Sequence, residues 1–205
     1  CSISRLKQKK MERFLENYQT FNCNPAAPEL LKKYADKVPR PLLDLWKNVG
    51  LGKYKHGLIE LINPDDYNDT LWTWLGKEVE NYVPIAIDAF GALYYYRLLE
   101  TPPDLEEFIE VAEDVCVVEI HDREIRTCKW SIEEFFNDYL NDEEVMKYFL
   151  RVELFKEANL KEGFLSNGEI YYFAQALMLG GAETIENVQK GDARTHQELL
   201  FEMGQ

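Results

Sequence analysis

The pattern of hydrophobic and polar positions changes twice along this chain. Apolar residues recur every three or four positions through roughly the first fifty residues, which is typical of amphipathic helices. They then form short runs bounded by turn residues, as buried strands do. Helical spacing returns after Trp130. This order predicts an α+β fold, with a central antiparallel sheet flanked by helices and a helical C-terminal part.

Capping residues and prolines mark where the helices begin. Pro41 occupies the first position of one helix, and Asn63 precedes Pro64 and two first-turn carboxylates. Ser131 opens a capping box with Glu134. The predicted helices cover residues 3–18, 29–36, 41–49 and 64–75, begin again after Ser131, Asn141 and Ser166, and end with 195–203.

The middle of the chain is expected to form strands, and the strand pattern indicates which aromatic side chains are buried or exposed. The strands are expected at residues 58–62, 83–88, 92–99, 115–120 and 125–130. Tyr94, Tyr95 and Tyr96 alternate sides along one strand, so at least one of them is expected to be exposed. The expected core tryptophans are Trp46, Trp72 and Trp130, whereas the candidates for contact with a partner are Tyr95, Trp74, Tyr171 and Tyr172.

Charge narrows the classes of ligand. The 205 residues include 37 acidic and 23 basic side chains, a net charge of −14. This balance disfavours nucleic acids and anionic membranes as direct ligands, and it favours a cationic partner. Acidity that merely keeps a cytosolic protein soluble is the plain alternative. Residues 100–162 hold 19 acids and 7 bases, so this half is the candidate contact surface.

The cysteines and the chain start bear on location. The four cysteines form no CxxC pair, which disfavours a zinc ribbon. Cys116 and Cys128 could face each other across the last hairpin, although a reducing cytosol keeps such thiols free. No run approaches the roughly 18 apolar residues of a membrane span, so we expect a cytoplasmic protein. The chain begins at Cys1 and not at Met, so we expect that an upstream segment was removed or is not shown. A lipid anchor on Cys1 is the alternative location.

Signatures of catalysis are absent from the sequence. It contains no GxGxxG, GxxxxGK[ST], GxSxG or HExxH motif. Asp65 and Asp66 form the most enzyme-like carboxylate pair, but their place in a first helical turn explains both residues. Glu119 and His121 would share a strand face, where a solvated hairpin tip is the ordinary interpretation and a metal site the alternative. No metal or cofactor is predicted.

Several phrases, in a fixed order, resemble one bacterial family. The phrases are Leu-Asp-Leu-Trp-Lys-Asn-Val-Gly at 43–50, the strand and Asn-Pro start at 57–67, the Val-Pro strand and Phe-Gly turn at 83–94, the helix at 131–136, the segment at 163–171 and Leu-Gly-Gly at 179–181. The first three resemble the GAD-like domain. The last three resemble the C-terminal domain of type VI secretion DNase-immunity proteins. The resemblance spans residues 28–204.

The resemblance implies a domain order and a function. It divides the chain into an N-terminal helix and loop at 1–27, a GAD-like lobe at 28–100 and an immunity-type C-terminal lobe at 101–205, which can pack as one compact domain. It implies a non-catalytic bacterial immunity protein that binds and neutralises a cognate secreted toxin, expected to be a nuclease. An acidic surface would mimic phosphate and occlude the cationic cleft of the toxin. The leading candidates for this surface are Glu106, Glu107, Glu110, Glu113 and Asp114.

Two other functions fit the same residues. The first is a protein-binding adaptor or regulatory module of the same fold, which the absence of a toxin gene nearby would favour. The second is a metal-dependent hydrolase built on Asp65, Asp66, Glu119 or His121. A metal assay on the purified protein would distinguish the hydrolase.

Overall fold

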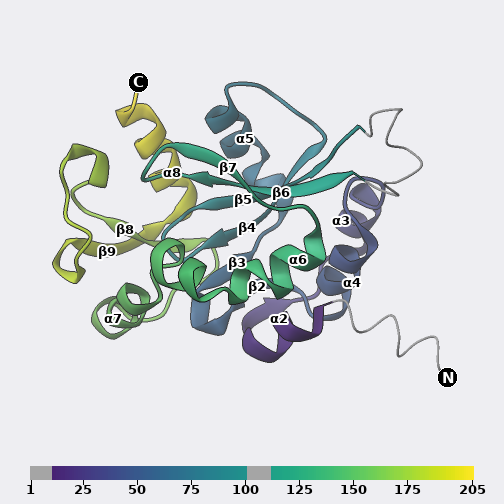
Figure 1. Ribbon diagram of the computed structural model, residues 1–205, viewed down its shortest axis with the longest axis horizontal. Helices are drawn as coiled ribbons and strands as arrows, with labels where there is room; N and C mark the ends of the chain where they lie inside the picture. The colour runs from purple at the N-terminus through teal and green to yellow at the C-terminus, as the bar shows by residue number, and fades with distance from the viewer. Residues whose placement is uncertain (1–10, 101–111) are drawn as a thin grey trace.

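The computed structural model of the chain describes residues 11–100 and 112–205. At its centre is a seven-stranded antiparallel sheet in which each strand pairs with the next along the chain (Figure 1). The strands are β1 (Thr20–Asn24), β2 (Leu51–Tyr54), β3 (Ile59–Leu61), β4 (Tyr82–Asp88), β5 (Leu93–Leu98), β6 (Glu113–Glu119) and β7 (Glu124–Lys129). Strands β3 to β7 confirm those predicted from the sequence, whereas β1 and β2 were not predicted. Because β5 pairs with β6, one sheet contains strands from both sides of residue 100, where the expected GAD-like lobe ends.

Helices cover both faces of this sheet. The elements α2 (Glu12–Asn17), α4 (Arg40–Asn48) and α6 (Ile132–Asn137) lie on one face, and α5 (Pro64–Leu75) and α8 (Ala193–Met203) on the other. Tyr94 and Tyr96 pack with the first set of helices and Tyr95 with the second. The prediction that one of these tyrosines is exposed is wrong, because both sides of β5 are covered. None of the described helices is both long and apolar enough to cross a membrane.

Local capping signals set the starts of α5 and α6 as predicted. Asn63 accepts a hydrogen bond from the amide of Asp65 at 3.1 Å, and Ser131 accepts one from the amide three residues on at 3.2 Å. At the next turn the cap is Asp142 and not the predicted Asn141, since the carboxylate of Asp142 accepts from two amides. The α+β class with flanking helices is confirmed.

The C-terminal region contains a second, two-stranded antiparallel sheet. The prediction that a helix begins after Ser166 is wrong, because the chain turns at Gly168, where φ is +80°, and enters a strand. Tyr171 and Phe173 of that strand pack on Phe90. The elements of this region are η3 (Tyr139–Asn141), η4 (Val145–Phe149), α7 (Val152–Glu162), β8 (Glu169–Phe173), η5 (Leu177–Leu179), η6 (Ile185–Asn187) and β9 (Val188–Asp192), and the short helices α3 (Pro28–Lys33) and η2 (Lys55–Gly57) complete the fold.

The hairpin of β6 and β7 corrects one prediction about the core. Trp130 directly follows β7, the last strand of the sheet, and is 68% exposed, whereas the predicted core residue Trp46 is fully buried. Trp72 is half-buried. Cys116 and Cys128 are both free thiols. They do not form the disulfide that the hairpin could have allowed, because the register does not set them opposite each other.

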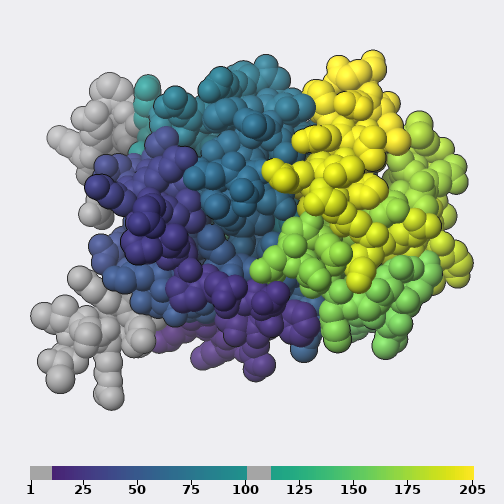
Figure 2. Space-filling view, turned by 180° about the vertical axis from the view of Figure 1, so that it is seen from behind, coloured from purple at the N-terminus to yellow at the C-terminus, as the bar shows by residue number. Residues whose placement is uncertain are grey.

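The C-terminal residues pack against the first half of the chain. Figure 2 shows the yellow C-terminal segment lying along the blue segment that contains α5, and light-green residues meeting the purple N-terminal segment. The indole nitrogen of Trp74 donates to the carbonyl oxygen of Gln197 at 3.2 Å. The side-chain amide of Asn167 donates to the backbone carbonyl oxygen of Asn22 at 3.3 Å. These contacts join the two halves of the chain.

Candidate partner-binding cleft

A cleft of about 550 Å³ opens between the first three strands and the C-terminal region. One side is formed by the segment after β1 and by β2 and β3. The other is formed by the start of α5, the turn before β8 and the start of α8. Its walls are partly apolar and partly charged, with Leu30, Leu51, Glu60, Tyr67, Asp192 and Arg194 among the lining residues.

The backbone at Gly52 brings β1 close to β2 at the edge of this cleft. Gly52 has a φ of +131°, and a β-carbon there would lie 2.0 Å from the carbonyl oxygen of Asn22. Only glycine fits such a conformation and such a close approach. The ladder between the two strands also shifts register between Thr20 and Asn22. Such an irregularity bends a strand, and here it lies beside the cleft.

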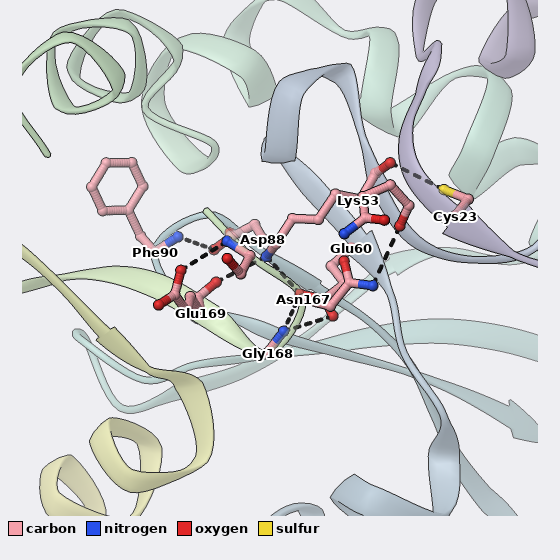
Figure 3. A network of polar contacts seen from close by, with 10 residues as sticks. Cys23, Lys53, Glu60, Asp88, Phe90, Asn167, Gly168 and Glu169 are labelled. Carbon is pink, nitrogen blue, oxygen red and sulfur yellow. Dashed lines mark hydrogen bonds and ion pairs between the residues drawn. The ribbon is translucent and has the colours of Figure 1, made fainter. Parts of the chain in front are cut away.

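A buried ion pair lies beside the cleft, which Glu60 lines (Figure 3). Lys53 of β2 and Glu60 of β3 are cross-strand partners, and Nζ lies 2.5 Å from Oε2. Lys53 is 0% exposed and Glu60 is 6% exposed. Burial lowers the pKa of the Lys53 ammonium, and attraction to Glu60 opposes that shift. Each charge neutralises the other where either one alone would be strongly destabilising.

The same ion pair fastens the C-terminal region to the sheet. The ammonium of Lys53 donates to the carbonyl oxygen of Glu169 at 2.8 Å. The carboxylate of Glu60 accepts a hydrogen bond from the amide of Gly168 at 2.9 Å. Figure 3 shows these groups together with Asn167, which lies in the same turn. Two strands of the sheet and the turn before β8 therefore share one polar network, which fixes the shape of the cleft.

Charged and polar side chains surround the opening. Asp66 lies in the first turn of α5, and Asp192 caps α8 by accepting from the amide of Thr195 at 2.8 Å, which lowers the pKa of its carboxyl. Arg194 donates from Nη1 to the carbonyl oxygen of Asp66 at 3.2 Å. Tyr67 is 5% exposed, and burial raises the pKa of its hydroxyl. A group that enters the cleft therefore meets the paired carboxylate of Glu60, two further carboxylates, one guanidinium and one phenol.

The acidic residues predicted to contact a partner lie in other surroundings. Three of the five fall outside the described residues, namely Glu106, Glu107 and Glu110. Glu113 is half-buried and accepts a hydrogen bond from the hydroxyl of Tyr96 at 2.5 Å. Asp114 is 0% exposed, and both of its oxygens accept from the guanidinium of Arg97, at 2.7 and 2.5 Å. Asp114 therefore already has a cationic partner within the protein.

The residues of the hydrolase alternative are not brought together. Asp65 pairs with the ammonium of Lys33 at 2.5 Å, at the start of α5. Glu119 and His121 are 3% and 4% exposed, so a solvated hairpin tip is the wrong interpretation for these two residues. The Nε2 atom of His121 lies 2.8 Å from the carbonyl oxygen of Phe90, in the turn between β4 and β5. Across residues 11–100 and 112–205, no group of three or more His, Cys, Asp or Glu is placed to hold a metal ion.

Sequence reasoning missed the residues that build the cleft. Lys53, Glu60, Tyr67 and Arg194 were not singled out, and two of the proposed contact aromatics, Tyr95 and Tyr171, are buried. One signal was present in the sequence. Glu60 is the only charged residue in the apolar run 58–62, and a charge inside a buried strand requires a partner.

Two family matches cover most of this fold. Residues 9–100 match the GAD-like domain. Residues 130–204 match the C-terminal domain of the T6SS immunity protein Tdi1, where T6SS denotes the type VI secretion system. The chain therefore carries a GAD-like domain followed by a Tdi1-type C-terminal domain, which confirms the resemblance seen in the sequence. The second match indicates a type VI secretion immunity protein. The cleft is lined by residues from both matched regions.

A solved structure is similar in fold over most of this chain. The crystal structure of Atu4351 from Agrobacterium tumefaciens superimposes with a TM-score of 0.67 at 18% sequence identity, covering 93% of this chain and 87% of that one. At this identity the likeness establishes the fold alone. No curated protein sequence matches this chain.

Proposed function

We propose that this chain is a non-catalytic immunity protein that binds a cognate toxin of a type VI secretion system and thereby neutralises it in the cytoplasm. The observation that carries the proposal is the match of residues 130–204 to the Tdi1 C-terminal domain, behind a GAD-like domain at 9–100. The net charge of −14 supports a cationic partner, because opposite charge accelerates encounter and selects against acidic competitors.

The toxin is expected to be a nuclease whose cationic cleft binds phosphates. An acidic face on the immunity protein would compete with those phosphates, and we assign Glu106, Glu107 and Glu110 to it, with Glu113 at its border. Asp114 supports the start of β6 through Arg97 and is not required to reach the toxin. Replacing the three assigned glutamates with lysine should weaken the complex and reduce its salt dependence. Unchanged affinity would refute phosphate mimicry but leave immunity standing.

Co-expression with the toxin encoded beside its gene tests the proposed function. We expect cells that produce both proteins to grow and the two proteins to co-purify as a stable complex. An unrelated toxin of comparable lethality serves as the control for specificity. Growth arrest without a complex would refute immunity and would favour the adaptor module of the same fold.

A further inference from the structure

Tyr67 presents an unused hydroxyl to the cleft. The side chain is 5% exposed and lines the cleft, yet its hydroxyl makes no hydrogen bond to any residue that the structure describes. Other tyrosines of similar burial have partners. Tyr54 donates to the carbonyl oxygen of Gly50 at 2.7 Å, and Tyr171 donates to that of Gly163 at 2.6 Å. The Tyr67 oxygen is not among the fully buried unpartnered atoms of the described residues, so it stays accessible and free to bond a group that enters the cleft.

The charges around that hydroxyl are not balanced within the protein. Glu60, Asp66, Asp192 and Arg194 line the same cleft as Tyr67. Glu60 is neutralised by its buried lysine, but neither Asp66 nor Asp192 forms an ion pair with a described residue. Arg194 bonds a backbone carbonyl and neither carboxylate. Two exposed carboxylates therefore face one guanidinium, and the remaining charge attracts a cation.

The walls of the cleft suit a long basic side chain. Ala26, Leu30 and Leu51 supply apolar surface on the β1 and β2 side. Lysine and arginine pack their carbon chains on such surface while the charged end reaches polar groups. The volume of about 550 Å³ is within the usual range for binding sites and leaves room for the loop that carries the side chain. The polar network of Lys53, Glu60 and the turn before β8 keeps this shape before binding.

We infer that the cleft receives an arginine or lysine side chain from a loop of the partner toxin, held by the Tyr67 hydroxyl and the carboxylates of Asp66 and Asp192. This inference rests on the proposed immunity function and adds to it a second contact, made by residues other than those assigned to the acidic face. The contact joins the GAD-like and Tdi1-type regions, because Tyr67 and Asp66 belong to the first and Asp192 to the second. Toxin binding then engages both regions at once.

The test uses the full chain and the purified toxin encoded beside its gene, measured by titration calorimetry at two salt concentrations. Tyr67→Phe removes only the hydroxyl and should weaken binding about tenfold. Asp66→Asn combined with Asp192→Asn should weaken it roughly ten- to a hundredfold and reduce its salt dependence. Asparagine at 192 still caps α8, so the fold is preserved. The control, Glu78→Gln with Glu80→Gln, makes the same charge change on an exposed turn and should bind within about twofold of wild type.

Each outcome separates this inference from the proposed function. If wild type fails to bind a toxin that it was expected to neutralise, the immunity proposal falls and this inference falls with it. If wild type binds and the cleft variants, with unchanged melting temperatures, bind equally well, the cleft is not the contact and immunity stands. If Arg194→Gln weakens binding while the two Asp→Asn changes tighten it, the occupant is anionic and the inference is wrong.

Discussion

Removing the charge of Glu60 should destabilise this protein far more than removing an exposed carboxylate. Glu60→Gln keeps the size of the side chain but leaves the ammonium of Lys53, which is 0% exposed, without an anion. Breaking a buried ion pair on one side costs about 3–5 kcal/mol. Lys53 can instead lose its proton, which at pH 7 costs an ordinary lysine about 4–5 kcal/mol, so the loss should not exceed that value.

The assay is urea unfolding followed by tryptophan fluorescence. Asp44→Asn is the matched control, because it breaks the exposed ion pair with Arg40 and should cost less than about 0.5 kcal/mol. Adding Lys53→Met to Glu60→Gln removes the second charge and should recover about 2 kcal/mol of the loss. The recovery is expected because glutamine at position 60 can still accept from the amide of Gly168.

The pH dependence gives a second check with a defined sign. In Glu60→Gln the folded state holds Lys53 in a site that disfavours its charge, so its folded pKa lies below its unfolded pKa. The stability lost through this site is therefore recovered above the unfolded pKa of Lys53, and it is lost again as the pH falls toward the folded pKa. The penalty should therefore be smaller at pH 9 than at pH 7. A loss below about 1 kcal/mol, or one that is the same at both pH values, would refute the view that this pair fastens the cleft.

Three further perturbations test other parts of the fold. Burial raises the pKa of Glu119 to about 7, so the stability that Glu119 contributes is fully present below the ordinary pKa of glutamate and is lost as the pH rises through 7. Glu119→Gln should therefore gain roughly 1–3 kcal/mol relative to wild type between pH 5 and pH 8, and parallel profiles would contradict this. The guanidinium of Arg123 donates to the carbonyl oxygen of Leu200 at 3.1 Å, in the last turn of α8. Arg123→Ala should lower the free energy of unfolding by about 1–2 kcal/mol and speed amide exchange in that turn. Unchanged exchange would exclude this role for Arg123. Gly52→Ala should lower the free energy of unfolding by more than about 2 kcal/mol. Gly163→Ala, whose β-carbon would meet no atom within 4 Å, should lower it by only about 1 kcal/mol. Equal melting temperatures would contradict this difference and show that β1 relaxes around the new side chain.

Elements with strong local signals were predictable. Asn63 before Pro64, and Ser131 before two glutamates, satisfy helix-start amides with their own side chains, so their meaning does not depend on the rest of the fold. β1 lacked such a signal, because Thr20–Asn24 is mostly exposed and shows no alternation of apolar residues. β8 carried a misleading one, since Ser166 and Glu169 imitate a capping box. There the Glu169 carboxylate accepts from the Ser166 amide, but tertiary packing makes the segment a strand.

The cleft was less predictable than the fold because its parts come from distant segments. The partnership of Lys53 and Glu60 depends on the register of β2 and β3, and β2 was itself not predicted. The sheet also has helices on both faces, and this arrangement buries Tyr95, which alternation alone placed at a surface. The acidic contact residues at 106–110 remain predictions. The family resemblance identified the fold because its phrases are mostly caps, turns and core positions, which say little about a binding surface.

Equilibrium binding of the purified full chain to the toxin encoded beside its gene tests the central claim most directly. The immunity function predicts a one-to-one complex with a Kd of about 10⁻⁷ M or tighter, which weakens as salt is added. A toxin that is folded and active, yet shows no binding to this chain at micromolar concentrations, would contradict it.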